Sequence, residues 1–192
     1  LHMVPKPDGS FRPCGDYRRL NTVTEDDRYP LPNILDFTGN LAGCTVFSKI
    51  DLVKGYHQIP MATEDISKTA ICTPFGLFEY LFMPFGLKNA AQTFQRLMDR
   101  LFRHLPFVFV YLDDILIASR SEEEHLLHLS QVLQILNEAG LQINPDKCVF
   151  ATSSLSFLGH QVSASGIAPM KRHVQALSDF PPPSTLKQLQ QF

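Results

Sequence analysis

Two adjacent aspartates inside the most apolar stretch of the chain constrain its fold more than any other feature. Residues 107–112 (FVFVYL) run into Asp113 and Asp114, and residues 115–118 (ILIA) form a second apolar run. Runs of this length, rich in β-branched and aromatic residues, indicate buried strands. Aspartate is depleted in strands and common in turns. The stretch therefore predicts a tight β-hairpin with two carboxylates at its tip.

Such a tip is consistent with two kinds of structure. Neighbouring carboxylates repel each other, so one of them normally takes up a proton. A bound divalent cation removes this penalty and keeps both carboxylates ionised. From this pattern alone, a solvated turn and a metal site both remain open.

Composition narrows the class of protein. The 192 residues, 44% hydrophobic and 19% charged, suffice for one globular domain with a substantial core. No apolar run approaches the roughly 18 residues that cross a bilayer, and no secretion signal is evident, so we expect an intracellular protein without a membrane partner. The four cysteines are far apart, which argues against a zinc ribbon. The net charge of −2 mildly disfavours a nucleic-acid binder, so phosphate binding would require a local basic patch.

Short strands and two amphipathic helices make up most of the remaining chain. Asp8–Gly9 indicates a hairpin turn that would bring Lys6 and Arg12 together, either as solvated cations or in a loop that closes over a polyphosphate. Hydrophobic spacings of three and four predict helices over 89–104 and 121–139. Strands are expected at 44–51, 141–143, 148–150 and 156–162. This order predicts an α+β fold with two helices on one face of an antiparallel sheet.

Helix caps and side-chain spacing give the two helices their predicted orientation. Asn89 is a candidate N-cap of the first helix, and Ser121 with Glu124 forms a capping box for the second. His125 and His128 fit a solvated helix face better than a metal pair. The predicted apolar face of the second helix comprises Leu126, Leu129, Leu133, Leu136 and Ala139.

Asp51 ends the predicted strand at 44–51, so it is a third candidate carboxylate beside Asp113 and Asp114 at the hairpin tip. Together they would place three carboxylates at one edge of a sheet. Mg²⁺ is typically bound by one or two carboxylates together with substrate phosphates. Two such ions about 3.5–4 Å apart activate a hydroxyl and stabilise the leaving oxygen in an in-line displacement. The pattern therefore fits nucleotidyl transfer.

Several sequence blocks resemble the reverse transcriptases of gypsy-type LTR retrotransposons. They are residues 47–59 (FSKIDLVKGYHQI), 83–98 (with MPFGLKNA and TFQRLM) and 111–114 (YLDD), and residues 4–21 and 157–160 match in the same order. The resemblance implies the right-hand polymerase palm, an antiparallel sheet with helices on one face, with partial fingers and the start of the thumb or connection. It also implies an RNA-directed DNA polymerase that adds dNTPs to a primer 3′-hydroxyl.

The resemblance also implies a division of the chain. Fingers are expected at 1–26 and 59–88, palm at 27–58 and 89–165, and the start of the thumb or connection at 166–192. The chain begins with Leu, so we expect a piece of a longer Pol polyprotein whose RNase H and integrase segments lie outside it. The expected location is cytoplasmic, in retrotransposon particles.

The family pattern assigns the metal site to the acidic residues. Asp51 and Asp113 would be the principal ligands of two Mg²⁺ ions, with Mn²⁺ as the alternative, and the backbone carbonyl of Leu52 would assist. Asp114 would complete the catalytic triad as the least direct ligand.

The pattern assigns a second group of residues to the incoming dNTP. Lys6 and Arg12 would hold the triphosphate, helped by backbone amides near Lys54 and Gly55. Tyr56 would pack under the sugar and exclude a 2′-hydroxyl. The alternative is an ordinary core tyrosine, which the spacing of five residues from Asp51 disfavours.

Phe85 completes this nucleotide group, at a position where retroviral enzymes carry glutamine. Lys147 resembles a lysine that protonates the pyrophosphate leaving group, with a surface role as the alternative. Leu158, Gly159 and His160 would form a primer grip for an RNA or DNA template with its primer.

The chain departs from the family pattern at Ala91 and Gln92, where Pro-Ala is usual, and at Phe11, where tryptophan is usual. Two rival functions also remain. One is a catalytically inactive, retroelement-derived module that binds nucleic acid or a protein partner. The other is a different palm enzyme, such as a nucleotide cyclase.

Overall fold

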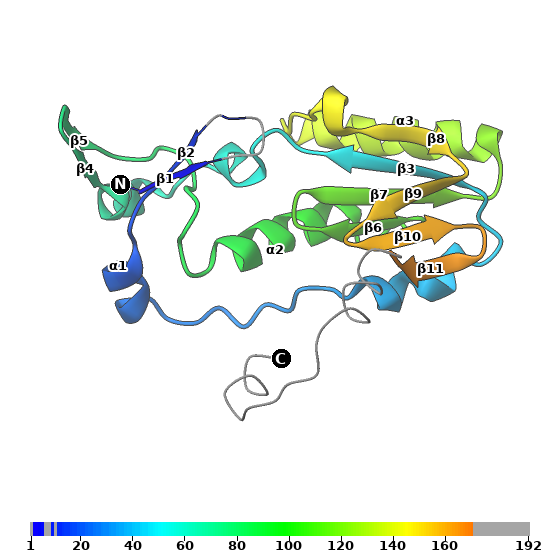
Figure 1. Cartoon of the computed structure of the whole chain (residues 1–192), viewed down its shortest axis with the longest axis horizontal. Coiled ribbons are helices and arrows are strands. Elements are labelled where there is room, and N and C mark those ends of the chain that lie inside the picture. The colour runs from blue at the N-terminus through cyan, green and yellow to red at the C-terminus, as the bar shows by residue number, and fades with distance from the viewer. Residues whose placement is uncertain (1, 6–8, 10, 171–192) are drawn as a thin grey trace.

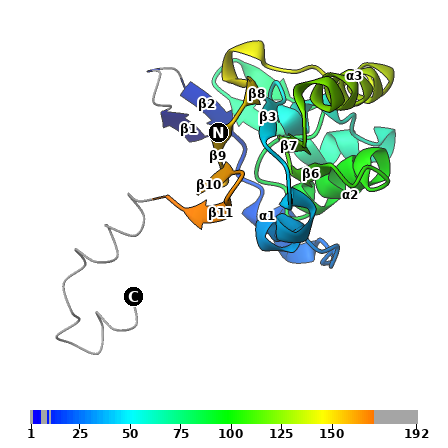
Figure 2. The ribbon, with the colours of Figure 1, turned by 90° about the vertical axis from the view of Figure 1, so that its right-hand side faces the viewer.

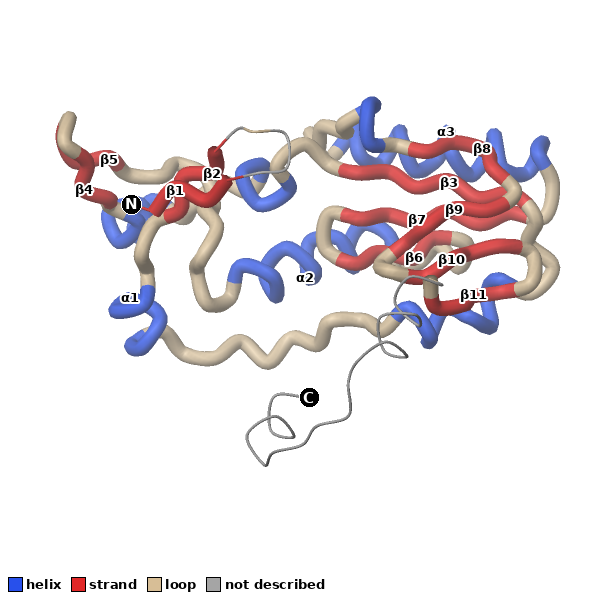
Figure 3. Tube along the Cα trace, viewed as in Figure 1, coloured by secondary structure: helices blue, strands red, loops and turns tan. Residues whose placement is uncertain are grey.

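The chain folds into a layered, strand-rich body with a smaller group of elements near the N-terminus (Figure 1). The computed structural model describes residues 2–5, 9 and 11–170. Figure 3 shows that both parts contain helices and strands. The strands are β1 (His2–Pro5), β2 (Phe11–Cys14), β3 (Val46–Asp51), β4 (Ile71–Thr73), β5 (Gly76–Phe78), β6 (Val108–Tyr111), β7 (Asp114–Ser119), β8 (Val149–Thr152), β9 (Ser154–Phe157), β10 (His160–Ser163) and β11 (Gly166–Pro169). The α-helices are α1 (Arg18–Val23), α2 (Ala90–Phe102) and α3 (Glu122–Glu138), and the 3₁₀ helices are η1 (Ile34–Leu41), η2 (Gly55–Gln58), η3 (Thr63–Thr69) and η4 (Pro145–Lys147).

A four-stranded antiparallel sheet with the order β6-β7-β3-β8 forms the centre of the body. Tyr111 pairs with Asp114, so Leu112 and Asp113 form the two-residue turn between β6 and β7. Asp51 pairs with Asp114 on the adjacent strand. The predicted hairpin tip is confirmed, and the sheet register brings all three aspartates to one end of the sheet.

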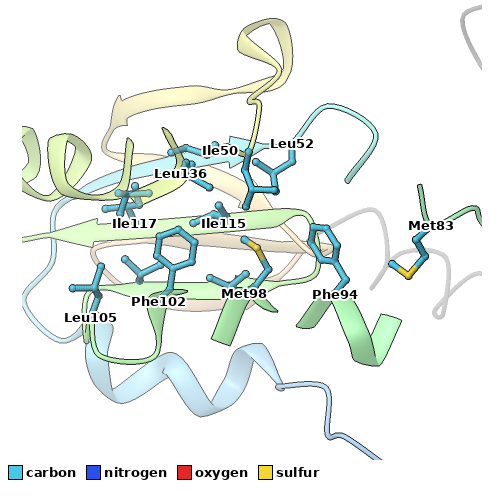
Figure 4. Packing of buried hydrophobic residues seen from close by; sticks show 14 of the residues in the cluster. Ile50, Leu52, Met83, Phe94, Met98, Phe102, Leu105, Ile115, Ile117 and Leu136 are labelled. Carbon is cyan, nitrogen blue, oxygen red and sulfur yellow. The ribbon is translucent and has the colours of Figure 1, made fainter. Parts of the chain in front are cut away.

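One face of this sheet packs against α2 and α3. Ile50, Ile115 and Ile117 project from the strands toward Phe94 and Met98 of α2 (Figure 4). All five side chains are fully buried. Burying side chains of this size contributes roughly 1.5–3 kcal/mol each, so this layer holds the strand ends firmly.

The opposite face is covered by η1 and a three-stranded sheet with the order β11-β10-β9. Figure 2 shows these strands on the other side of the central sheet from the two α-helices. Phe47, Leu116 and Phe157 are buried between the layers. The α+β palm with both helices on one face is confirmed, and the second sheet covers the other face.

The elements near the N-terminus include two small hairpins, β1–β2 and β4–β5. The predicted β1–β2 hairpin is confirmed. The Tyr17 hydroxyl donates to the Thr69 carbonyl at 3.0 Å, which joins the segment before α1 to η3. Within the described part of the chain, no helix has the length and apolarity that a membrane crossing requires.

The predicted apolar face of α3 is right at Leu129 and Leu136, which contact the core, but wrong at its two other leucines. Its buried residues are His125, Val132 and Leu136, whereas Leu126 and Leu133 are exposed. The helix turns this way because the His125 imidazole forms hydrogen bonds to serines of β3 and β7, which makes a buried histidine tolerable.

Two other local predictions also change. Asn89 stands at the N-cap of α2, but its side chain bonds to the backbone of Glu25 and Asp27 instead of capping the helix. The strand expected at 156–162 is two strands, because a turn at Leu158–Gly159 divides it into β9 and β10.

Candidate active site

The turn that carries Asp113 is held by a buried side chain of α2. Leu112 has a φ of 53°, a left-handed conformation that is unfavourable for a residue with a branched side chain. The Leu112 backbone N–H donates to Gln95 Oε1 at 2.8 Å, and Gln95 Nε2 donates to the Val110 carbonyl at 3.1 Å. Gln95 is fully buried. The sequence analysis missed this residue. Its position beside the apolar residues of a predicted amphipathic helix indicated that it could be buried.

Asp51 and Asp113 come together from two separate segments. The Leu52 N–H donates to the Asp113 carbonyl at 3.3 Å, which ties the end of β3 to the turn. Burial raises the pKa of Asp113, and the carboxylates of Asp114 and Asp51 raise it further. Burial also raises the pKa of Asp51, which Lys147 partly opposes. Both pKa shifts come first from burial, which makes it costly to keep these two carboxylates ionised.

Asp114 is engaged differently from the other two aspartates. Lys49 Nζ lies 2.7 Å from Asp114 Oδ1. Lys147 Nζ lies 3.8 Å from Asp51 Oδ1, and its side chain is 66% exposed. The predicted triad is therefore adjacent in space, but its third member forms a close ion pair with a lysine that the sequence analysis did not single out.

Gly55 and Tyr56 lie next to the aspartates in η2. A Cβ atom on Gly55 would lie 2.8 Å from the Asp113 Cβ, so only glycine fits there. The Tyr56 ring packs against Phe94 and Phe85, with centroids at 5.5 and 5.2 Å. Tyr56 and Phe85, both predicted nucleotide contacts, are therefore neighbours.

Lys54 precedes this turn of helix in a left-handed conformation, with a φ of 50°. The structure thus brings Lys54, Gly55, Tyr56 and Phe85 to one region beside Asp113. Lys6 lies outside the described residues. Arg12 is described only as a backbone position in β2, paired with Val4.

The predicted primer grip occupies a tight turn between β9 and β10. Leu158 and Gly159 both have positive φ values, 46° and 76°, and Phe157 pairs with His160. Two-residue hairpin loops with two positive φ values match the twist of the flanking strands. His160 Nδ1 lies 2.9 Å from the Leu158 carbonyl oxygen. β9 runs toward the end of the central sheet that carries Asp113 (Figures 1 and 3).

Among the described residues, no three His, Cys, Asp or Glu side chains form a cluster that would hold a metal ion by themselves. The chemistry of the site nevertheless fits a hard cation. Asp51 and Asp113 offer carboxylate oxygens, and Mg²⁺ commonly uses one or two carboxylates and takes its other ligands from water and substrate phosphates.

A family model described as reverse transcriptase (RNA-dependent DNA polymerase) matches residues 4–162. The chain belongs to the reverse transcriptase family. It is 46% identical over 99% of its length to the Retrovirus-related Pol polyprotein from transposon 297 of Drosophila melanogaster. It is 38% identical over 98% of its length to the Transposon Tf2-3 polyprotein of Schizosaccharomyces pombe. The resemblance inferred from the sequence blocks is confirmed.

These relatives are much longer than this reverse transcriptase chain, which spans 19% of the transposon 297 polyprotein and 14% of the Tf2-3 polyprotein. Among solved structures, the foamy viral protease-reverse transcriptase dRH in complex with double-stranded DNA superimposes with a TM-score of 0.89 at 28% identity. It is matched over all of this chain and 34% of its own. The foamy viral protease-reverse transcriptase in complex with an RNA/DNA hybrid gives a TM-score of 0.81 at 27% identity, over 98% of this chain and 26% of its own.

Proposed function

We propose that this chain is the catalytic core of an RNA-directed DNA polymerase from a retrotransposon Pol polyprotein. It would join dNTPs to a primer 3′-hydroxyl along an RNA or DNA template and release pyrophosphate. The observation that carries the proposal is the partly buried pair of aspartates, Asp51 and Asp113, which two separate segments bring together at one end of the palm sheet.

Asp51 and Asp113 would hold two divalent cations, Mg²⁺ or Mn²⁺, with help from the Leu52 carbonyl. When bound, such ions activate the attacking hydroxyl and stabilise the leaving oxygen. Asp114 would be the least direct participant, which agrees with its ion pair to Lys49. Burial, and then neighbouring carboxylates, raise the pKa of both principal aspartates. This supports a cation at this position, because a positive charge would offset the cost of keeping them ionised.

The incoming dNTP would lie over Gly55 and Tyr56. Gly55 packs closely against Asp113, so a sugar bound over Gly55 would lie next to the metal ligands. Tyr56, fixed between Phe85 and Phe94, would form the floor under the sugar and exclude a 2′-hydroxyl. We assign the triphosphate to Lys6 and Arg12 and to the backbone amides at Lys54 and Gly55.

Lys147 would act on the leaving pyrophosphate, and the β9–β10 turn would act on the primer terminus. The Lys147 ammonium group is exposed and lies near Asp51, so it can reach a leaving pyrophosphate. Leu158, Gly159 and His160 would hold the primer terminus. The fingers at 1–26 and 59–88, the palm at 27–58 and 89–165, and the thumb or connection from 166 remain the proposed divisions. Cytoplasmic retrotransposon particles remain the proposed location.

Primer extension tests the proposal directly. The purified chain is given an RNA template, a DNA primer, dNTPs and Mg²⁺, alongside Asp113→Asn and the matched control Asp36→Asn, whose aspartate is exposed in η1. We expect extension by the wild type and the control and its loss in Asp113→Asn. The same panel is repeated in a longer Pol chain that includes the sequence after residue 192.

Two outcomes would contradict the proposal. The inactive-module alternative is favoured if neither the 192-residue chain nor the longer Pol chain extends a primer, although both fold and bind template-primer. The cyclase alternative is favoured if cyclic nucleotide appears by mass spectrometry when nucleoside triphosphate is supplied alone.

A further inference from the structure

Lys49 occupies an unusual place for a lysine. It lies inside β3, between two neighbouring strands, where charged residues are normally depleted. Side chains alternate along a strand, so Lys49 shares the face of Phe47 and Asp51, which is the face covered by β9–β11. Its side chain is only 23% exposed. A buried cation at this position requires a specific partner.

That partner is Asp114, whose side chain is 24% exposed and whose Oδ1 lies 2.7 Å from Lys49 Nζ. The same ammonium group lies 5.8 Å from the centroid of the Phe157 ring. Phe157 is the last residue of β9, directly before the turn at Leu158. Lys49 therefore contacts both the aspartate beside the metal ligands and the strand that leads to the proposed primer grip.

If both side chains were solvated, Lys49 and Asp114 would form an ordinary surface ion pair without a special role, because water screens such pairs. Here both side chains are about three-quarters buried, and Asp114 is close enough to Asp51 and Asp113 to influence their charge. Within the described part of the chain, Asp114 forms its ion pair with Lys49. Without that lysine, the carboxylate would be available to a metal ion at the adjacent site.

We propose that Lys49 is a positioning residue that keeps Asp114 out of the metal site, so that Asp51 and Asp113 alone provide carboxylate ligands. This inference rests on the proposed function, because it concerns the same site. Lys49 touches no reacting atom. Its ammonium group pairs with Asp114, and its charge also acts on Asp51 from a greater distance. In this way Lys49 limits the metal site to two carboxylate ligands, although three carboxylates lie next to each other.

Metal binding without substrate tests this role. Mn²⁺ is titrated into the purified chain, without nucleic acid or nucleotide, and free Mn²⁺ is measured by electron paramagnetic resonance. In Lys49→Met, we expect the affinity for Mn²⁺ to rise about tenfold, a coupling typical of contacting groups. A gain of affinity cannot result from partial unfolding, which would weaken binding.

The decisive comparison is the same substitution in the Asp114→Asn background. There Lys49→Met should change the Mn²⁺ affinity by less than about threefold, since the carboxylate it would release is gone. Lys49→Arg should retain the wild-type affinity. Lys68→Met removes the lysine of an exposed ion pair with Asp65 and controls for net charge, with no change expected.

The possible results separate this inference from the function on which it rests. Equal gains from Lys49→Met in both backgrounds would show a long-range charge effect and overturn the positioning role, as would no gain in either. If Asp113→Asn binds Mn²⁺ as tightly as the wild type, or if the wild type binds none, the metal assignment itself fails and the role of Lys49 fails with it.

Discussion

Gln95 offers the sharpest test of how the fold positions Asp113. Its buried side-chain amide accepts a hydrogen bond from the Leu112 N–H at 2.8 Å and donates to the Val110 carbonyl at 3.1 Å and to Asp99 Oδ1 at 2.8 Å. In Gln95→Leu the side chain keeps a similar volume but makes none of these bonds. The turn would then lose the contact that holds Leu112 in its left-handed conformation.

The expected magnitude follows from these contacts. Each backbone group left unpaired in the interior costs about 1–3 kcal/mol, and the added apolar contact of leucine returns part of this. We expect Gln95→Leu to lower the free energy of unfolding by about 2–4 kcal/mol, measured by urea denaturation. Primer extension under conditions where the variant is folded should fall by about a hundredfold, because small displacements of a catalytic group have effects of that size.

The matched control is Gln134→Leu. Gln134 is an exposed residue of α3 whose amide reaches only Glu138 on the same helix. Its replacement should change the unfolding free energy by less than about 0.5 kcal/mol. The reasoning is refuted if Gln95→Leu behaves like this control in both assays. A loss of stability without a loss of activity would show that the Gln95 hydrogen bonds support the sheet but do not position the turn.

Three further predictions concern other parts of the site and core. Gly55→Ala should lower primer extension at least tenfold, because the new Cβ would clash with Asp113. Gly39→Ala is the control, since a Cβ there meets nothing within 4 Å and should have no such effect. Equal primer extension by the two variants would contradict the close packing at Gly55. Tyr56→Ala should raise the ratio of ribonucleotide to deoxynucleotide incorporation, measured with each nucleotide in single-turnover extension; an unchanged ratio would leave Tyr56 as a core residue. Burial lowers the pKa of His125, so the unfolded state binds a proton at a higher pH than the folded state does. The free energy of unfolding should therefore fall as the pH is lowered through about 6.5, and His125→Asn should flatten part of that slope in urea denaturation; the same slope in the variant would exclude His125 as its source.

The features that could be predicted from the sequence depend on local patterns. The hairpin at Asp113 was predictable because two apolar runs end at a pair of turn-forming residues. The strand that ends at Asp51 was predictable because a short run with β-branched and aromatic residues ends at an aspartate. The Ser121 N-cap of α3 was also correct, since Ser121 Oγ accepts from the Glu124 N–H at 3.2 Å. The other half of the predicted capping box was wrong, because the Glu124 carboxylate accepts from the Arg120 N–H instead of from Ser121. Neighbouring residues set these features, so periodicity and turn chemistry suffice to find them.

The features that could not be predicted depend on partners far away in the chain. His125 was interpreted as a solvated residue, but Ser48 and Ser119 lie 2.6 and 2.7 Å from its two ring nitrogens. That network rotates α3 and exposes Leu126 and Leu133 instead of burying them. Gln95 and Lys49 were missed for the same reason. The position of Gln95 beside the apolar face of a helix indicated that it could be buried, but its partners at Val110 and Leu112 are known only from the fold.

The structure also bears on whether the Asp113 turn is a solvated turn or a metal site. A solvated turn would relax toward an unstrained backbone with carboxylates open to water. Here Leu112 is held at a positive φ, Gly55 packs too closely for a side chain, and burial raises the pKa of Asp113. Each feature costs stability, and strain of this kind persists only where the surrounding structure enforces it. The buried layer of α2 provides that enforcement through Gln95 and Phe94. A fold that holds a carboxylate against both strain and charge repulsion favours a cation site over a solvated turn.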